Sequence, residues 1–241
     1  MVSPKPGLHV DDGGSGRVPV VLHHGLGADL EVWRPQIDHL RPSRRVLAFD
    51  MRGHGRSPRA PEYSVDSAVS DLEDVTAGLP RFWLVGHSFA GVVLTAFASR
   101  HPERLHGLVY VDALGDARDP PPEVREYFRT HDAAMTPDRL QEAYLEMLGP
   151  MAKPATQRQV LQSVARMDLP AFAALRASML EMAPPRHFNG PKFAIDAEGP
   201  DNPRMASRLP GIRRLEIPGV SHWLMLDDPR AVNAALDQVL A

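Results

Sequence analysis

A serine flanked by glycines follows a short apolar run, and this pattern has the clearest chemical meaning in the chain. Residues 86–91 (GHSFAG) come directly after the apolar residues 82–85 (FWLV), and a helix-like segment follows them. A serine at the tip of a sharp strand-to-helix turn has its hydroxyl lifted clear of the sheet edge, where a substrate can reach it. Ser88 is therefore the candidate nucleophile. The plainer alternative is a turn whose serine caps the following helix.

A serine hydroxyl is a weak nucleophile at neutral pH and needs a base within hydrogen-bond reach. His222 has the best position of the 11 histidines, because it lies between the last predicted strand and the last predicted helix. That position brings it to the carboxyl edge of a parallel sheet, where Ser88 lies and where open α/β sheets build their sites. The other histidines expected near this edge lie beside turns that explain them structurally: His23, His24, His54 and His87.

The oxyanion that forms during acyl transfer needs two N–H donors. One would be the backbone N–H of Phe89, the residue after the candidate nucleophile. The other would come from residues 23–27 (HHGLG), the loop after the first predicted strand, where glycine lets the backbone approach a substrate closely. Leu26 is the favoured donor in that loop, and Gly25 is the substrate-contacting residue beside it. The alternative is a simple glycine turn after a strand.

Six apolar runs predict the strands that would hold these residues. They are residues 18–22, 45–49, 82–85, 108–111, 192–195 and 214–217. Near-continuous apolar strands that alternate with helical segments indicate a parallel sheet covered on both faces. Helices are predicted at residues 32–40, 66–79, 91–99 and 229–240. The predicted fold class is therefore α/β, with a mostly parallel, doubly wound sheet.

Residues 114–186 interrupt this alternation. They contain no convincing strand, and Pro and Gly divide them into predicted helices at 122–131, 137–148, 156–167 and 170–182. Six of the ten methionines fall here: Met135, Met147, Met151, Met167, Met179 and Met182. The pattern predicts a helical insertion with its own small core, a lid whose adaptable apolar side chains line a pocket, or both together. We expect one domain, residues 1–241, with residues 114–186 as a helical cap.

Bulk composition excludes several kinds of function. The 241 residues are enough for one large α/β domain. A formal net charge of -3 gives no sign of binding to nucleic acid or to an acidic membrane. The absence of cysteine excludes disulfides, thiolate metal sites and a cysteine nucleophile. No secretion signal or bilayer-spanning apolar run is visible, so we expect a cytoplasmic protein, monomeric or homodimeric.

Four motifs in this order resemble the α/β-hydrolase superfamily. They are residues 24–27 (HGLG), 50–57 (DMRGHGRS), 86–91 (GHSFAG) and 218–223 (PGVSHW). The resemblance covers nearly the whole chain outside the helical insertion. It implies a mostly parallel sheet of eight strands or slightly fewer, with a cap at the methionine-rich helices. In the family, the segment at residues 50–57 is mainly a structural turn near the site.

The resemblance leaves the acid partner of His222 open. The family usually places it after the strand predicted at residues 192–195, in a Gly-x-x-Asp pattern, and here Asp201 comes about one residue late. Some members take the acid from the end of the strand after the elbow helix, which is Asp112 in this chain. Asp196 and Glu198 are the remaining candidates. Any of them would accept the imidazole N–H, fix its tautomer and stabilise the imidazolium.

Together these patterns predict a serine hydrolase that cleaves small apolar carboxylic esters or lactones through an acyl-enzyme, an esterase of class EC 3.1.1. The chemistry requires no metal and no organic cofactor. Lyase, carbon–carbon hydrolase or perhydrolase chemistry on the same fold is one alternative, and a non-catalytic protein that binds small molecules is another. Ester turnover with an acyl burst would favour the hydrolase, and tight binding with negligible turnover would favour the binding protein.

Overall fold

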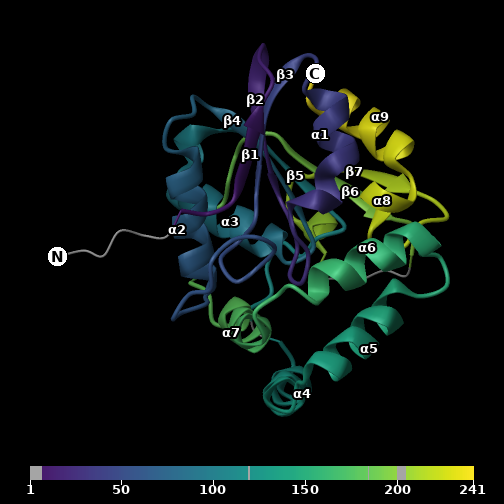
Figure 1. Cartoon of the computed structure of the whole chain (residues 1–241). Coiled ribbons are helices and arrows are strands. Elements are labelled where there is room, and N and C mark those ends of the chain that lie inside the picture. Colours follow the sequence, from purple (N-terminus) through teal and green to yellow (C-terminus); the bar gives the residue numbers. More distant parts are fainter. Residues whose placement is uncertain (1–6, 119, 184, 200–204) are drawn as a thin grey trace.

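A seven-stranded sheet forms the centre of the molecule (Figure 1). The computed structural model describes residues 7–118, 120–183, 185–199 and 205–241. The strands are β1 (Val10–Gly13), β2 (Arg17–His23), β3 (Arg44–Phe49), β4 (Phe82–His87), β5 (Leu105–Val111), β6 (Lys192–Ala197) and β7 (Arg213–Ile217). Their order across the sheet is β1-β3-β2-β4-β5-β6-β7, and every neighbouring pair is parallel except β1 with β3. The predicted α/β class and mostly parallel sheet are confirmed.

Strand β1 was not predicted, because its sequence VDDG has no apolar alternation. Its backbone pairs antiparallel with β3, so that Val10 lies opposite Phe49. The carboxylate of Asp12 in β1 accepts a hydrogen bond from Arg45 of β3 at 2.6 Å. Charged side chains are usual on an edge strand, where they discourage pairing with other molecules. Tertiary pairing rather than local pattern therefore makes this segment a strand.

Helices cover both faces of the sheet (Figure 1). One face carries α1 (Arg34–Leu40), α8 (Leu224–Asp227) and α9 (Pro229–Val239), and the other carries α2 (Val65–Thr76) and α3 (Ala90–Arg100). Successive strand residues point to opposite faces. Accordingly, Val20 and Leu22 of β2 join the core under α1 and α9, while Val21 joins the core under α2 and α3. No helix in the described ranges is long and apolar enough to cross a membrane.

Four helices lie between β5 and β6: α4 (Pro122–Ala133), α5 (Pro137–Leu148), α6 (Pro154–Val164) and α7 (Leu169–Leu180). Each has proline in its first two positions, where the missing N–H would have no helical partner. The described part of residues 114–186 contains no strand and only an isolated bridge from Leu114 to Met205. Figure 1 shows these helices gathered at one end of the sheet.

Candidate active site

Ser88 occupies the sharp turn between β4 and α3. Its φ of 55° lies in the left-handed region, which is strained for a residue other than glycine and is common at functional sites. A Cβ on Gly86 would lie 2.5 Å from Leu94 Cδ1 of α3, and one on Gly91 would lie 2.2 Å from the carbonyl oxygen of Leu114. The two glycines therefore allow α3 to pack closely against the neighbouring strand and loop, which sharpens the turn that carries the serine.

Asp112 joins His222 to the carboxyl edge of the sheet. Its Oδ2 lies 2.6 Å from His222 Nδ1, and its Oδ1 accepts the Ala197 N–H at 3.2 Å. Its own N–H donates to the Ile195 carbonyl of β6 at 2.9 Å. Its φ is 43°, and within the described ranges Ser88 and Asp112 are the only non-glycine residues with positive φ. Both strained positions therefore belong to candidate site residues.

The other acid candidates are arranged differently. Asp196 is buried and forms an ion pair with Arg214, with 2.9 Å between Oδ2 and Nε. Burial raises the pKa of the Asp196 carboxyl, while Arg214 opposes the rise. Glu198 is exposed. Asp201 lies outside the described residues. Among the candidates that the structure describes, Asp112 is the one in contact with the imidazole.

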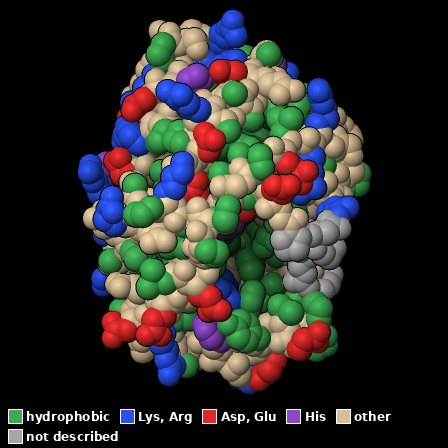
Figure 2. All heavy atoms as spheres, turned by 90° about the vertical axis from the view of Figure 1, so that its right-hand side faces the viewer, with side chains coloured by type: hydrophobic (Ala, Val, Ile, Leu, Met, Phe, Trp, Pro, Cys, Tyr) green, Lys and Arg blue, Asp and Glu red, His purple; other side chains and the backbone are tan. Residues whose placement is uncertain are grey.

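Two cavities open onto both Ser88 and His222. The larger, of about 530 Å³, reaches the ends of β6 and β7 and is lined by Asp112, Asp196 and Arg214. The smaller, of about 180 Å³, lies against α4, α5 and α7. Its walls are mainly apolar or aromatic: Leu26, Phe89, Phe128, Tyr144, Phe172 and Trp223. Figure 2 shows one face of the molecule hollowed, with hydrophobic side chains lining the hollow.

The loop after β2 brings Leu26 and Gly25 next to the candidate nucleophile. A Cβ on Gly25 would lie only 3.0 Å from the Ser88 Cβ, so the backbone of this loop approaches the serine closely. The Leu26 carbonyl accepts a hydrogen bond from the Tyr144 hydroxyl of α5 at 2.7 Å. Phe89 is the first residue of the turn into α3, where backbone N–H groups have no helical partner. Leu26 and Phe89 line the smaller cavity together with Ser88.

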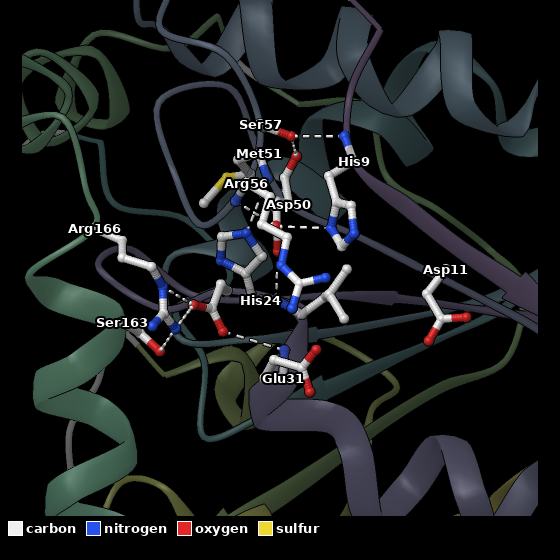
Figure 3. A network of polar contacts seen from close by, with 12 residues as sticks. His9, Asp11, His24, Glu31, Asp50, Met51, Arg56, Ser57, Ser163 and Arg166 are labelled. Carbon is white, nitrogen blue, oxygen red and sulfur yellow. Dashed lines mark hydrogen bonds and ion pairs between the residues drawn. The ribbon is translucent and has the colours of Figure 1, made fainter.

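A polar network behind this loop fixes its conformation (Figure 3). Asp50, directly after β3, accepts the N–H groups of Leu30 at 2.7 Å and Arg56 at 2.8 Å. Arg166, just beyond α6, forms an ion pair with Asp29. In Figure 3 the side chains of His24, Asp50 and Arg166 come together from the loop after β2, the loop after β3 and the end of α6. The segment at residues 50–57 thus contacts the site loop through structural hydrogen bonds.

His87 contacts the backbone of His222, whereas the sequence interpretation placed it near the site only as a structural residue beside a turn. Its Nε2–H donates to the His222 carbonyl at 2.8 Å, and the two ring centroids are 4.5 Å apart. Burial lowers the pKa of His87 well below 6.5, and the neighbouring His222 adds to this effect. The neutral ring therefore holds the backbone of the candidate base. The contact joins residues 135 positions apart, so no local pattern could indicate it.

Asp227 anchors the loop that carries His222 and was missed by the sequence interpretation. Its Oδ2 accepts the Ser221 N–H at 2.8 Å and the Ser221 hydroxyl at 2.5 Å. Its Oδ1 accepts the Thr156 hydroxyl at 2.7 Å and the Lys153 N–H at 3.0 Å. The side chain is buried, so these charge-assisted bonds are protected from water. The loop after β7 is therefore tied to the start of α6.

Comparison with known proteins places this geometry among related folds. A family model described as alpha/beta hydrolase fold matches residues 18–177. The (lyso)-N-acylphosphatidylethanolamine lipase of Mus musculus is 36% identical over 118 residues, which are 45% of this chain and 34% of the lipase. The match thus spans about a third of that relative's length. A similar protein from Caenorhabditis elegans, an abhydrolase domain-containing protein, is matched over 24% of its length.

Among solved structures, a thermophilic esterase from Thermogutta terrifontis superposes on the chain with a TM-score of 0.84 at 25% identity. The match covers 99% of this chain and 95% of the esterase. The enol-lactonase from Burkholderia xenovorans LB400 superposes with a TM-score of 0.81 at 23% identity, over 97% of this chain and 96% of the lactonase. Both the esterase and the lactonase therefore share the fold with this chain over almost their whole length.

Proposed function

This chain belongs to the α/β-hydrolase fold family, and we propose that it is a serine hydrolase that cleaves small carboxylic esters or lactones through an acyl-enzyme. The observation that carries the proposal is the 2.6 Å hydrogen bond between Asp112 and His222, beside a strained Ser88 that lines the larger cavity with both residues. The likeness to an esterase over nearly the whole chain supports an ester as the substrate.

In the proposed reaction, Ser88 Oγ attacks the substrate carbonyl carbon while His222 removes its proton. The hydrogen bond to Asp112 engages His222 Nδ1, so Nε2 is the nitrogen left to act as base. The carboxylate of Asp112 stabilises the imidazolium that results. The imidazolium then returns the proton to the departing alcohol oxygen, and Ser88 is left acylated. Water, deprotonated by the same imidazole, attacks the acyl-enzyme; the bond from the acyl carbon to Ser88 Oγ breaks, the imidazolium returns the proton to Oγ, and the acid is released.

The negative charge on the carbonyl oxygen requires preorganised donors. We assign this role to the backbone N–H groups of Leu26 and Phe89, which line the smaller cavity with Ser88. Tyr144 and the network around Asp50 support the assignment, because they hold the Leu26 loop from two sides. Donors that are fixed before the reaction need no reorganisation when the charge develops.

We assign the acyl group of the substrate to the smaller, apolar cavity and the alcohol to the larger cavity. A volume of about 180 Å³ is below the roughly 300–1,000 Å³ of sites for drug-sized ligands, so the acyl group should be short. In this proposal the segment α4–α7 acts as the cap of a single domain, because three of its helices contribute walls to the acyl cavity.

Pre-steady-state hydrolysis of 4-nitrophenyl acetate tests this proposal. We expect a burst of nitrophenolate approaching one equivalent per Ser88, followed by slower turnover as the acyl-enzyme hydrolyses. Ser88→Ala should lose both phases, while Ser43→Ala, which alters an exposed serine, should retain them. Turnover by Ser88→Ala at the rate of the unaltered protein would contradict the proposal. Tight substrate binding without turnover would favour a binding protein instead.

A further inference from the structure

A single arginine lies in the apolar cavity beside Ser88. Helix α7 contributes Phe172, Arg176 and Met179 to the cavity wall, and residues at this spacing share one face of a helix. Among the described lining residues, Arg176 is the only one of the Asp, Glu, Lys or Arg type. A guanidinium stays charged at any physiological pH. The cavity therefore combines apolar walls with one permanent positive charge.

Two aromatic rings hold this guanidinium. Its Cζ lies 3.8 Å from the centroid of the Phe128 ring and 4.9 Å from that of Phe172. In cation–π contacts of this kind, the negative face of each aromatic ring attracts the positive charge. The N–H donors lie in the plane of the group, and that planar fork matches the two oxygens of a carboxylate. The aromatic contacts thus hold the charge of Arg176 without using any of its N–H donors.

Asp132 of α4 engages only part of the guanidinium. Its Oδ2 lies 3.0 Å from Arg176 Nε, but the Nε–H does not form a hydrogen bond with it. Neither terminal nitrogen of Arg176 has a hydrogen-bond partner among the residues that the structure describes. The Arg176 side chain is only 16% exposed. An unpaired donor is costly at a buried atom such as Nε, and the terminal nitrogens, which solvent reaches, can donate to an anionic ligand instead of to water.

The field of Arg176 reaches the reactive part of the cavity. Burial raises the pKa of the Tyr144 hydroxyl, and the charge of Arg176 opposes that rise. The same hydroxyl holds the carbonyl of Leu26, in the loop assigned to the oxyanion. A purely structural arginine would account for the pairing of α4 with α7 through Asp132. It would not account for a charge whose free donors border the cavity that contains Ser88.

We propose that Arg176 binds a carboxylate at the far end of the acyl chain, so that the preferred substrates are monoesters of short dicarboxylic acids. This inference rests on the proposed hydrolysis at Ser88. The apolar walls hold the methylene groups between the two ends. Asp132 already places one negative charge beside Arg176, and for that reason a monoanion fits better than a doubly charged phosphate. The small volume of the cavity limits the chain length.

The test compares monomethyl glutarate with methyl pentanoate, which have the same leaving group and acyl length and differ in one terminal carboxylate. The unaltered protein should favour monomethyl glutarate by at least about tenfold in kcat/KM, the effect of one charge-assisted contact. In Arg176→Gln the ratio of kcat/KM for monomethyl glutarate to that for methyl pentanoate should fall to about one, whatever the change in the two separate rates. Arg125→Gln is the matched control, because Arg125 lies on α4 opposite Glu181 and does not line the cavity.

A second variant and a binding measurement separate the possible failures. Arg176→Lys keeps the charge but loses the planar fork, so it should retain part of the preference even if Arg176→Gln folds poorly. In a Ser88→Ala background, monomethyl glutarate should raise Tm, and adding Arg176→Gln should abolish the rise. Equal kcat/KM for the two esters, or equal Tm shifts with and without Arg176, would overturn the inference. An Arg176-dependent Tm shift in a protein that hydrolyses neither ester would support the carboxylate site and refute the hydrolysis.

Discussion

Single residues at the carboxyl edge of the sheet have distinct roles despite similar chemistry. Asp112 and Asp196 end neighbouring strands, yet Asp112 meets His222 and Asp196 meets Arg214. The difference arises from the left-handed turn at Asp112, which directs its carboxylate away from the regular strand direction. A strained backbone at a residue other than glycine persists when the surroundings enforce it. Here the bonds to Ile195 and Ala197 supply that constraint.

His87 acts at the same scale, as a positioning residue for His222. We predict that His87→Leu lowers kcat about tenfold with little change in KM, because the carbonyl of His222 loses its donor and the ring can shift. His87→Gln, whose amide can donate to the same carbonyl, should recover most of the rate. Steady-state kinetics with 4-nitrophenyl acetate measures both. Full activity in His87→Leu would contradict the positioning role and show that His87 only fills space in the core.

Among the elements, the loop after β7 depends on a helix that is distant in sequence. Asp227 joins this loop to the start of α6 through four hydrogen bonds. We predict that Asp227→Ala lowers the free energy of unfolding by roughly 2–4 kcal/mol, because buried donors lose a charged acceptor. The neighbouring Asp228→Ala removes only the cap of α9 and should cost about 1 kcal/mol. Urea unfolding compares them, and equal losses would contradict the anchoring role.

Helix boundaries show how far local signals reach. The predicted helix at residues 156–167 begins at Pro154 in the structure, because proline suits the first turn. The helix predicted at residues 32–40 is divided into a 3₁₀ turn (Leu30–Trp33) and α1. The six predicted strands are all present, and most of them are buried strands with continuous apolar runs. The edge strand β7 (RRLEI) is the exception, because most of its residues are exposed. β1 has no such run and could not be predicted.

The residues of the candidate site also fall into two groups, those that lie in a local sequence motif and those that only tertiary contacts reveal. Ser88 and His222 lie in short motifs, so the sequence alone was enough to name them as candidates. The contact of Asp112 with His222 joins residues 110 positions apart, and no pattern separated it from the alternative at Asp201. Arg176 and Asp227 act through tertiary contacts that leave no local signature. The sequence held one weak indication for Asp227. Because Asp228 alone is enough to cap α9, the aspartate before it needs another role.

At the scale of the whole molecule, buried neutral histidines make stability depend on pH. Four of them are almost fully buried: His23, His24, His54 and His87. Burial lowers the pKa of His23 and of His54 to about 3. The unfolded chain, with histidine pKa values near 6.5, therefore takes up protons first as the pH falls. The stability from these residues is complete above about pH 6.5 and is lost progressively toward pH 3.

We predict that His23 and His54 together lower the free energy of unfolding by roughly 3–4 kcal/mol between pH 7 and pH 5, because each contributes a slope that approaches about 1.4 kcal/mol per pH unit below pH 6.5. Urea unfolding at several pH values measures the slope. His54→Gln removes one of these titrating groups. The slope of the free energy of unfolding against pH should therefore decrease by about 1.4 kcal/mol per pH unit below pH 6.5, whatever the stability of the variant at pH 7. A profile that is flat or that rises toward pH 5 would show that these histidines are not held neutral.

The most direct test of the proposed chemistry is the rate at which a fluorophosphonate modifies Ser88, followed by intact-mass and peptide mass spectrometry. The unaltered protein should gain one adduct on Ser88, and Ser88→Ala should gain none. Asp112→Asn should slow labelling by roughly 10³–10⁴-fold, because an amide facing Nδ1 favours the wrong imidazole tautomer. Asp196→Asn, on the neighbouring strand, should label at nearly the unaltered rate. Equal labelling of Ser88→Ala, or an Asp112→Asn variant that reacts as fast as the unaltered protein, would contradict a Ser88 nucleophile activated through His222 and Asp112.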